Sequence, residues 1–299
     1  MSEFFVGIAG TPAGHSWALG LALLAAVSHA VFGALQKGRF DPWLTRGAID
    51  GAYAIMALPF VIFLVPWPEP HMWPIFAGML VIHVVYKVLQ AMAYSKGAYT
   101  VVYPVVRGTG PLVTVVAAGV VFGEHFEPLQ WLGVLLLSGG IFGLAGFNLT
   151  RSKVDQSALR SAIALAFITG LIVALYTTYD AYGIRATADP FTFLAWFFLI
   201  DGLVFPFIAA RRFRMMKNPP PLLPLLRRGM IGGVLAYASF GSIMLATRLD
   251  TVGEAAVLRE TSTVFAALIG WLFLKETVGP VRAGLMAIIA LGAVVVEFG

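Results

Sequence analysis

The sequence predicts an all-α polytopic membrane protein, with ten transmembrane helices arranged as two inverted five-helix repeats around a central cavity. Three observations lead to this fold class: the composition, ten apolar segments of spanning length, and an internal repeat. Of the 299 residues, 59% are hydrophobic and only 12% are charged. A soluble domain carries about 25% charged residues, so too little polar surface remains for a water-facing globule, and lipid is the expected surrounding.

The ten segments hold about 18–25 residues each, enough to cross a ~30 Å hydrocarbon core. They cover residues 16–36, 44–65, 72–94, 98–122, 129–148, 160–183, 190–210, 222–246, 252–274 and 280–297. Turn-forming stretches such as PWPEP at 66–70 and NPPP at 218–221 separate them. The first fifteen residues hold no Lys or Arg, so they lack the basic region of a cleaved signal peptide and the first span is expected to be retained.

Basic residues predict the orientation. The loops after the odd-numbered segments hold fifteen Lys and Arg, whereas the opposite loops hold only Arg185 and Arg248. Because Lys and Arg concentrate in cytoplasmic loops, we expect a multi-pass protein of the cytoplasmic (inner) membrane with both termini on the non-cytoplasmic side. The basic residues behind the net charge of +5 lie mostly in these loops. We therefore expect the lipid bilayer, and not nucleic acid, as a partner.

The internal repeat appears when the fourth segment is shifted by 152 residues onto the ninth. The aligned polar and helix-breaking positions are Lys96 with Arg248, Arg107 with Arg259, Thr109 with Thr261, Glu124 with Glu276, Pro128 with Pro280 and Gly140 with Gly292. Five spans per half is an odd number, so the second half enters the membrane upside down. We predict an N-terminal repeat over residues 1–150 and an inverted C-terminal repeat over 151–299, which suits alternating access. A duplication kept for folding alone is the alternative.

Spans four and nine both end in glutamate after an apolar run, VVFGE at Glu124 and LFLKE at Glu276, and Pro111 lies thirteen residues before Glu124. With the ten-span inverted repeat, this pattern resembles the drug/metabolite transporter (DMT) superfamily, of the EamA-like kind. Span nine departs from it, with Thr263 in place of the proline. The resemblance covers the whole chain and implies a secondary transporter, most similar to bacterial exporters of aromatic and other amino acids. The two glutamates are expected to anchor helix ends.

Polar residues follow one face of the third span at helical spacing: His83, Tyr86, Lys87, Gln90 and Tyr94. Ionisable groups at membrane depth normally face a cavity or a partner. We therefore interpret this face as a wall of the substrate cavity, with a polar seam bonded to neighbouring helices as the alternative. The Lys87 side chain is also close enough to the cytoplasmic end to reach the interface there.

Tyr99, Tyr103 and Arg107 share a face of the fourth span, and Arg107 lies about nine residues, or ~13 Å, from the cytoplasmic end. Pro111 frees the carbonyl of Arg107 from helical hydrogen bonding. A weakened helix beside a buried cation is where a substrate carboxylate could bind. A plain proline kink, with Arg107 paired to an acidic neighbour, is the alternative.

The second half contributes Tyr179, Asp180, Glu254, Arg259 and Glu260. We expect Asp180 or Glu254 to neutralise Arg107 or Arg259 in the empty site. Arg259 and Glu260 point about 100° apart on a straight helix, so a simple pair between them is not expected. An amino acid would place its carboxylate on the cation, its ammonium on the acid and its side chain against tyrosines.

His29, midway along the first span, is predicted to contact substrate or relay a proton, with a packing role as the alternative. Asp180, Glu254 and His29 could each bind a coupling proton or serve as a fixed counter-charge. Asp50 is expected to pair with Arg46 at i, i+4.

These observations predict a carrier that exports aromatic or neutral amino acids or related small metabolites, without a cofactor or metal. A drug or nucleotide-sugar carrier is the nearest alternative, although phosphorylated substrates favour more than two deep cations. A membrane enzyme is less expected, because the sequence has no HExxH or GxSxG motif and no cysteine. A channel is also less expected, since no filter-like repeated segment is found.

Overall fold

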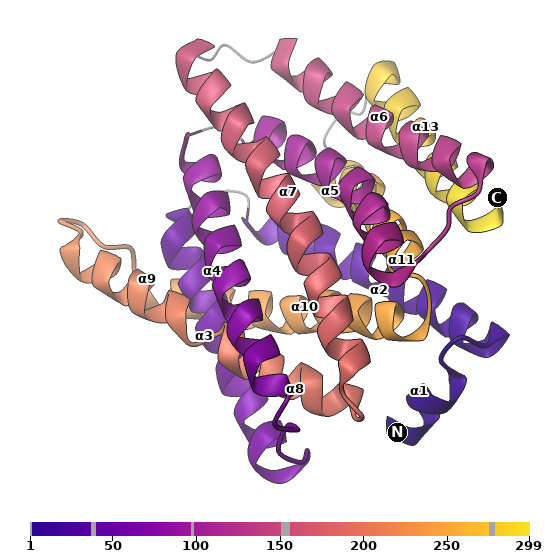
Figure 1. Ribbon diagram of the computed structural model, residues 1–299. Coiled ribbons are helices and arrows are strands. Elements are labelled where there is room, and N and C mark those ends of the chain that lie inside the picture. Colours follow the sequence, from indigo (N-terminus) through magenta and orange to yellow (C-terminus); the bar gives the residue numbers. More distant parts are fainter. Residues whose placement is uncertain (1, 37–39, 97–98, 151–155, 275–278) are drawn as a thin grey trace.

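The computed structural model describes residues 2–36, 40–96, 99–150, 156–274 and 279–299, and every regular element in these ranges is an α-helix (Figure 1). Side chains are described in these ranges apart from those of residues 34–36, 99–101, 156–159, 270–271 and 273–274. In chain order the helices are α1 (Ser2–Ile8), α2 (Pro12–Gln36), α3 (Pro42–Phe63), α4 (Met72–Lys96), α5 (Tyr99–Phe122), α6 (Pro128–Thr150), α7 (Gln156–Ala186), α8 (Pro190–Asp201), α9 (Val204–Met215), α10 (Leu222–Leu249), α11 (Val252–Arg259), α12 (Ser262–Leu274) and α13 (Pro280–Phe298).

Local sequence explains where several helices begin. Asp41 accepts hydrogen bonds from the backbone N–H groups of Trp43 and Leu44, and Pro42 occupies the first turn of α3. Asp189 plays the same part for α8, where its carboxylate accepts from the N–H of Phe191. A side-chain acceptor at the N-cap and proline in the first turn satisfy or remove N–H groups that have no partner within the helix.

The predicted all-α polytopic architecture is confirmed, and the helix bounds follow the predicted spans closely. Nine segments of the described chain are long and apolar enough to cross a membrane. The remaining expected span, the ninth at 252–274, is interrupted, because α11 ends at Arg259 and α12 begins at Ser262. The seventh span is interrupted as well, between α8 and α9. Interrupted backbone at membrane depth is tolerated where protein surrounds it, and in transporters it marks binding sites.

Helix packing follows the symmetry expected of two inverted halves (Figure 1). The fifth and tenth spans, α6 and α13, pack on each other. The first span packs along the eighth, as α2 on α10, and the third packs along the sixth, as α4 on α7. Exchanging the halves converts one of these pairs into the other. The predicted division at residues 150 and 151 borders residues outside the described ranges.

Glycine allows the closest approach between α6 and α13. A Cβ atom added to Gly292 would lie 2.5 Å from the backbone N of Leu137 and 2.7 Å from the carbonyl O of Gly133. Large apolar side chains cover the outside of the bundle instead, as at Phe63 and Val120, the latter 82% exposed. Such a surface is stable when lipid covers it.

Candidate functional site

Arg107 and Arg259 lie in one buried group of side chains, which we call the arginine cluster: Arg107, Thr177, Arg259, Glu260 and Ser262. Nε of Arg107 lies 2.6 Å from Oε2 of Glu260. Its Nη2 donates to the hydroxyl of Ser262 at 3.2 Å. Both arginines and Glu260 are at most 4% exposed. The two halves of the chain therefore meet at these residues, as the repeat predicted.

Arg259 is held more loosely than Arg107. Its Nε lies 3.8 Å from Oε1 of Glu260, and its Nη2 donates to the hydroxyl of Thr177 at 3.5 Å. Among the described residues this Nε has no hydrogen-bond partner. Because a guanidinium carries five N–H donors, Arg259 keeps hydrogen-bonding capacity at a buried position.

The hypothesis that Asp180 or Glu254 neutralises the arginines is corrected by Glu260, which faces both of them. The offset of about 100° expected on a straight helix does not apply, since α11 ends at Arg259. Short-range backbone hydrogen bonds replace helical ones here, from the N–H of Glu260 to Val257 O and from Thr261 to Leu258 O. Such a tight turn inside a helical span is typical of a hinge.

The fourth span is not interrupted where Pro111 predicted a weakened helix. α5 runs from Tyr99 to Phe122 as one helix that includes Pro104 and Pro111. The interruption is found in its repeat counterpart, where Thr263 takes the place of the proline. Arg107 pairs with an acidic neighbour, Glu260, as the alternative interpretation of this span expected.

Aromatic rings lie beside the arginine cluster. The guanidinium carbon of Arg107 is 5.9 Å from the ring centre of Tyr103, which in turn stacks on His29 at 6.4 Å. Nδ1 of His29 is 3.3 Å from the hydroxyl of Ser239. These contacts bring together residues of the first, fourth and eighth spans. The side chain of Tyr99 lies outside the described part of the chain.

A second buried group, the ionic chain, joins Arg46, Asp50, Lys87, Asp201, His83 and Asp180. Nζ of Lys87 lies 2.6 Å from Asp50 and 2.8 Å from Asp201, and it donates to the hydroxyl of Tyr53 at 3.0 Å. Lys87 is 1% exposed, so it does not take the interfacial position that was the alternative for it. Two carboxylates at membrane depth replace the water that the ammonium would otherwise seek.

The remainder of the ionic chain runs through His83. Its Nε2 is 3.0 Å from Oδ2 of Asp180, and its Nδ1 is 3.2 Å from Oδ1 of Asp201. Asp201 is the last residue of α8. Each interrupted span thus supplies an acidic residue, Asp201 or Glu260, to a buried cation. At the other end of the ionic chain, the predicted pair between Arg46 and Asp50 is confirmed at 2.8 Å.

Aromatic contacts connect the ionic chain to the predicted face of the third span. The ring of Tyr176 lies 5.0 Å from that of His83 and 4.8 Å from that of Tyr86. Gln90 donates to the hydroxyl of Tyr86 at 2.7 Å. Tyr179, in contrast, has its hydroxyl against Gly78 on α4 and its ring 6.4 Å from Tyr182. The polar face of span three is therefore bonded to neighbouring helices in this conformation.

Several residues of the two groups were not predicted as substrate-binding residues, namely Arg46, Asp50, Tyr53, Tyr176, Thr177, Asp201, Glu260 and Ser262. The available signals were an acidic residue followed by glycine inside an apolar span, at 201–202, and a run of four polar residues at 260–263. Both mark the helix interruptions.

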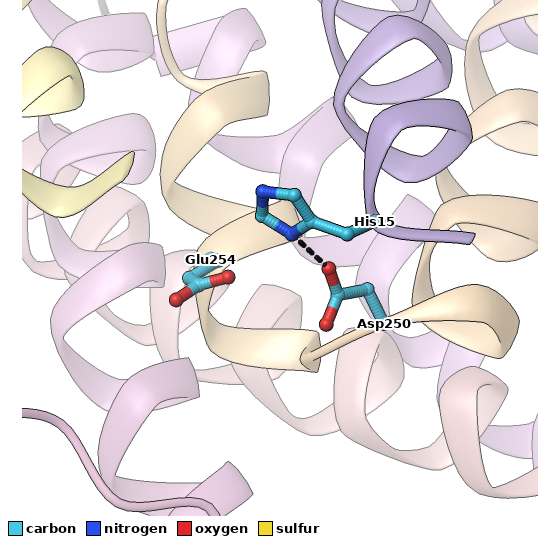
Figure 2. A group of neighbouring side chains, drawn as sticks. All are labelled: His15, Asp250 and Glu254. Carbon is cyan, nitrogen blue, oxygen red and sulfur yellow. Dashed lines mark hydrogen bonds and ion pairs between the residues drawn. The ribbon is translucent and has the colours of Figure 1, made fainter. Parts of the chain in front are cut away.

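A third group of ionisable residues lies where α2, α13 and the connection between α10 and α11 meet. Nδ1 of His15 is 2.5 Å from Oδ2 of Asp250, and the carboxylate of Glu254 lies beside them (Figure 2). Nε2 of His15 is 3.3 Å from Glu297. His15, Asp250 and Glu254 offer ligand atoms within 4.8 Å of one another, a donor set that could hold a divalent cation. Glu254 belongs to this group and not to the arginines.

Glu124 anchors a helix end, as predicted. Its two carboxylate oxygens accept hydrogen bonds from the N–H groups of Val252 and Gly253, at 2.8 and 3.0 Å, and so cap α11. Glu276 lies outside the described residues.

Fold and site together define a polytopic membrane protein with buried ion pairs at interrupted helices. The EamA-like transporter family matches residues 14–146 and again residues 160–298. The chain belongs to this family, and the predicted resemblance to the drug/metabolite transporter superfamily is confirmed.

Two further proteins are similar to this chain. The uncharacterized protein y4nH of Sinorhizobium fredii is 35% identical over 72 residues, which cover 24% of this chain and 62% of that protein. The matched segment thus spans less than two thirds of the relative. A solved structure described only as the crystal structure of a protein superimposes with a TM-score of 0.73 at 17% identity, covering 95% of this chain and 98% of the other. This likeness supports the fold.

Proposed function

We propose that the protein is an alternating-access transporter that exports neutral amino acids, aromatic ones in particular, across the cytoplasmic membrane. The observation that carries this proposal is Arg259, which is buried, loosely paired and adjacent to a second arginine at an interrupted helix. Arg107 and Arg259 face Glu260, so this trio has a net charge of +1. A buried excess cation favours an anionic ligand group, and a guanidinium binds a carboxylate through two parallel hydrogen bonds.

Asp180 suits the ammonium group of the same ligand. Its Oδ1 is buried and has no hydrogen-bond partner among the described residues. Asp180 lies three residues after Thr177 on α7, and Thr177 accepts from Arg259. Residues at i and i+3 of a helix share a face. The acceptor for an ammonium therefore lies about one helical turn from the donor for a carboxylate, a spacing that suits an α-amino acid.

The surrounding rings suit an apolar or aromatic side chain. Tyr103 lies beside Arg107 and stacks on His29, and Tyr86 and Tyr176 pack on each other and on His83. Aromatic rings contribute apolar contact and edge-to-face packing to such a ligand. A nucleotide sugar fits this site less well. Lys87 is already paired with Asp50 and Asp201, so only the guanidinium groups of the two clustered arginines remain to bind a diphosphate.

The transport cycle follows from the two interruptions. The site side chains are buried in this conformation, so access from either side requires helix movement. The turns at Gly202–Leu203 and Glu260–Thr261 can absorb changes in backbone angles without breaking long helices. The positive loops favour a cytoplasmic position for the α9–α10 connection and an outer position for both termini.

Counterflow in proteoliposomes tests the proposal. Vesicles loaded with unlabelled phenylalanine should accumulate labelled phenylalanine transiently, and vesicles loaded with a nucleotide sugar or a cationic drug should not. Arg259→Gln should abolish the accumulation, whereas Arg227→Gln, an exposed arginine on α10, should leave it unchanged. Exchange with nucleotide sugars alone, or undiminished amino-acid exchange by Arg259→Gln, would contradict the proposal.

A further inference from the structure

We infer that the triad Asp180–His83–Asp201 is a proton-binding site, and that the ammonium group of the amino acid displaces its proton. The protein would then exchange one proton for one amino acid. This inference rests on the proposed function for its substrate, and on the geometry of the ionic chain for the proton.

The position of His83 between two carboxylates, with a hydrogen bond to Asp180 and an ion-pair distance to Asp201, favours an extra proton in the triad. Both ring nitrogens of His83 face carboxylate oxygens, at 3.0 Å from Asp180 and 3.2 Å from Asp201. A neutral imidazole has one N–H donor and one bare nitrogen, and a bare nitrogen repels a carboxylate oxygen. The arrangement is stable when His83 donates from both nitrogens, or when one carboxyl group carries the second proton. Either way, the triad holds one proton more than a neutral histidine and two carboxylates.

The charge of the ionic chain agrees with this count. Arg46 and Lys87 contribute two positive charges, and Asp50, Asp180 and Asp201 contribute three negative charges. With a neutral His83 the six linked groups have a net charge of −1, and with one extra proton they are neutral. All six are at most 7% exposed, and an uncompensated charge at membrane depth is expensive. One extra proton therefore makes the ionic chain neutral by itself, while the arginine cluster keeps its net charge of +1.

The groups that face the triad come from three helices. They are Asp50 and Tyr53 on α3, Tyr86 and Lys87 on α4, and Tyr176 on α7. Arg259 approaches from α11 through Thr177. Lys87 and Arg46 are both paired with Asp50. The proton on the triad is the exchangeable one.

Asp180 couples the binding of the proton to the binding of the amino acid, because it belongs both to the triad and to the proposed ammonium site. Its Oδ2 faces His83, and its Oδ1 has no partner among the described residues. An ammonium group that binds Oδ1 supplies the positive charge that the proton supplied. The imidazolium N–H bond then breaks, its electron pair remains on nitrogen, and the proton passes to water on the open side. When the amino acid leaves, the triad takes up a proton from the opposite side and is neutral again.

Calorimetry of phenylalanine binding to the purified wild-type protein tests the inference. Titrations at one pH in buffers of different ionisation enthalpy should give a slope of about one proton released per phenylalanine bound. Because the proton and the ammonium group of phenylalanine compete for the triad, the apparent Kd should fall about tenfold for each unit by which the pH is raised, in the range where the triad is protonated. Binding with no proton release, or with dependence on Na⁺ and not on pH, would overturn the inference while leaving the proposed function intact. Absence of binding would overturn the proposed function itself.

A variant at His83 locates the proton. His83→Gln should still bind phenylalanine, with the proton release lost and the Kd independent of pH. His125→Gln removes an exposed histidine from the loop after α5 and should behave like wild type. Proton release that persists in His83→Gln would exclude the triad. If His83→Gln does not fold, the wild-type titration still decides whether a proton is exchanged.

Discussion

Nε of Arg107 lies 2.6 Å from Oε2 of Glu260, although the two residues belong to different halves of the chain. Glu260 directly follows Arg259, the repeat counterpart of Arg107, at the point where the ninth span is interrupted. The two related arginines therefore face one carboxylate from opposite halves. The contact between the two repeats therefore has a net positive charge, and its geometry depends on the turn that follows Arg259.

Glu260→Gln should destabilise the protein strongly. The substitution leaves Arg107 and Arg259 without a counter-charge at a buried position, which costs roughly 3–5 kcal/mol. Thermal unfolding in detergent, followed by tryptophan fluorescence, should show a clear fall in Tm. Added phenylalanine should raise the Tm of this variant by more than that of wild type, because the substrate carboxylate replaces the lost charge. An unchanged Tm would show that the pair is not formed.

Lys87→Met should also lower the stability, since it leaves Asp50 and Asp201 buried and unpaired. The expected loss is roughly 3–5 kcal/mol. Lys96→Met is the matched control on the same helix, because Lys96 is exposed at the end of α4 and its hydroxyl contact with Ser161 is long, at 3.5 Å. The same thermal measurement should separate the two variants. Equal Tm values would mean that Lys87 reaches the membrane surface after all.

Neighbouring glycines on α6 should respond differently to the same substitution. A Cβ atom at Gly140 would lie 2.7 Å from Ile289 and 3.1 Å from the carbonyl O of Leu285 on α13, whereas a Cβ at Gly139 meets nothing within 4 Å. Gly140→Leu should reduce the amount of folded protein after detergent extraction, by forcing α6 and α13 apart. Gly139→Leu should be tolerated. Equal yields of monodisperse protein would contradict the packing of these helices.

Glu124→Ala should loosen the start of α11 without unfolding the protein. Loss of an N-terminal cap costs about 0.5–2 kcal/mol, and here two N–H groups lose their acceptor. Hydrogen exchange should become faster in the amides of residues 252–256 and stay unchanged elsewhere. Glu127→Ala removes an exposed carboxylate from the same loop and serves as the control. Unaltered exchange in Glu124→Ala would exclude the cap.

Span positions were predictable because apolar length and turn residues depend on local sequence alone. Arg107 and Arg259 were found from their cost in lipid and from the 152-residue shift. Their partner was not, because assigning it requires the interruption after Arg259. A straight helix turns Glu260 away from Arg259, and only the actual backbone shows that one carboxylate faces both arginines.

Lys87 shows a second limit. Its distance along the helix from the cytoplasmic end allowed an interfacial position, and the competing carboxylates come from the second and seventh spans. Which spans are neighbours follows from tertiary packing, which periodicity does not reveal. The same holds for Tyr179 of the sixth span, whose hydroxyl lies against Gly78, a contact that the sequence does not reveal.

The central claim is that Arg259 binds the carboxylate of an amino acid, and a comparison of ligand analogues tests it most directly. Phenylalanine, phenethylamine and 3-phenylpropionate would be compared as competitors of labelled phenylalanine binding, for wild type and for Arg259→Gln. In wild type, removal of the carboxylate should weaken binding by at least about tenfold, as expected for a hydrogen bond between charged groups. In Arg259→Gln, phenylalanine and phenethylamine should bind equally. A variant that still prefers phenylalanine by the wild-type factor would contradict the assignment.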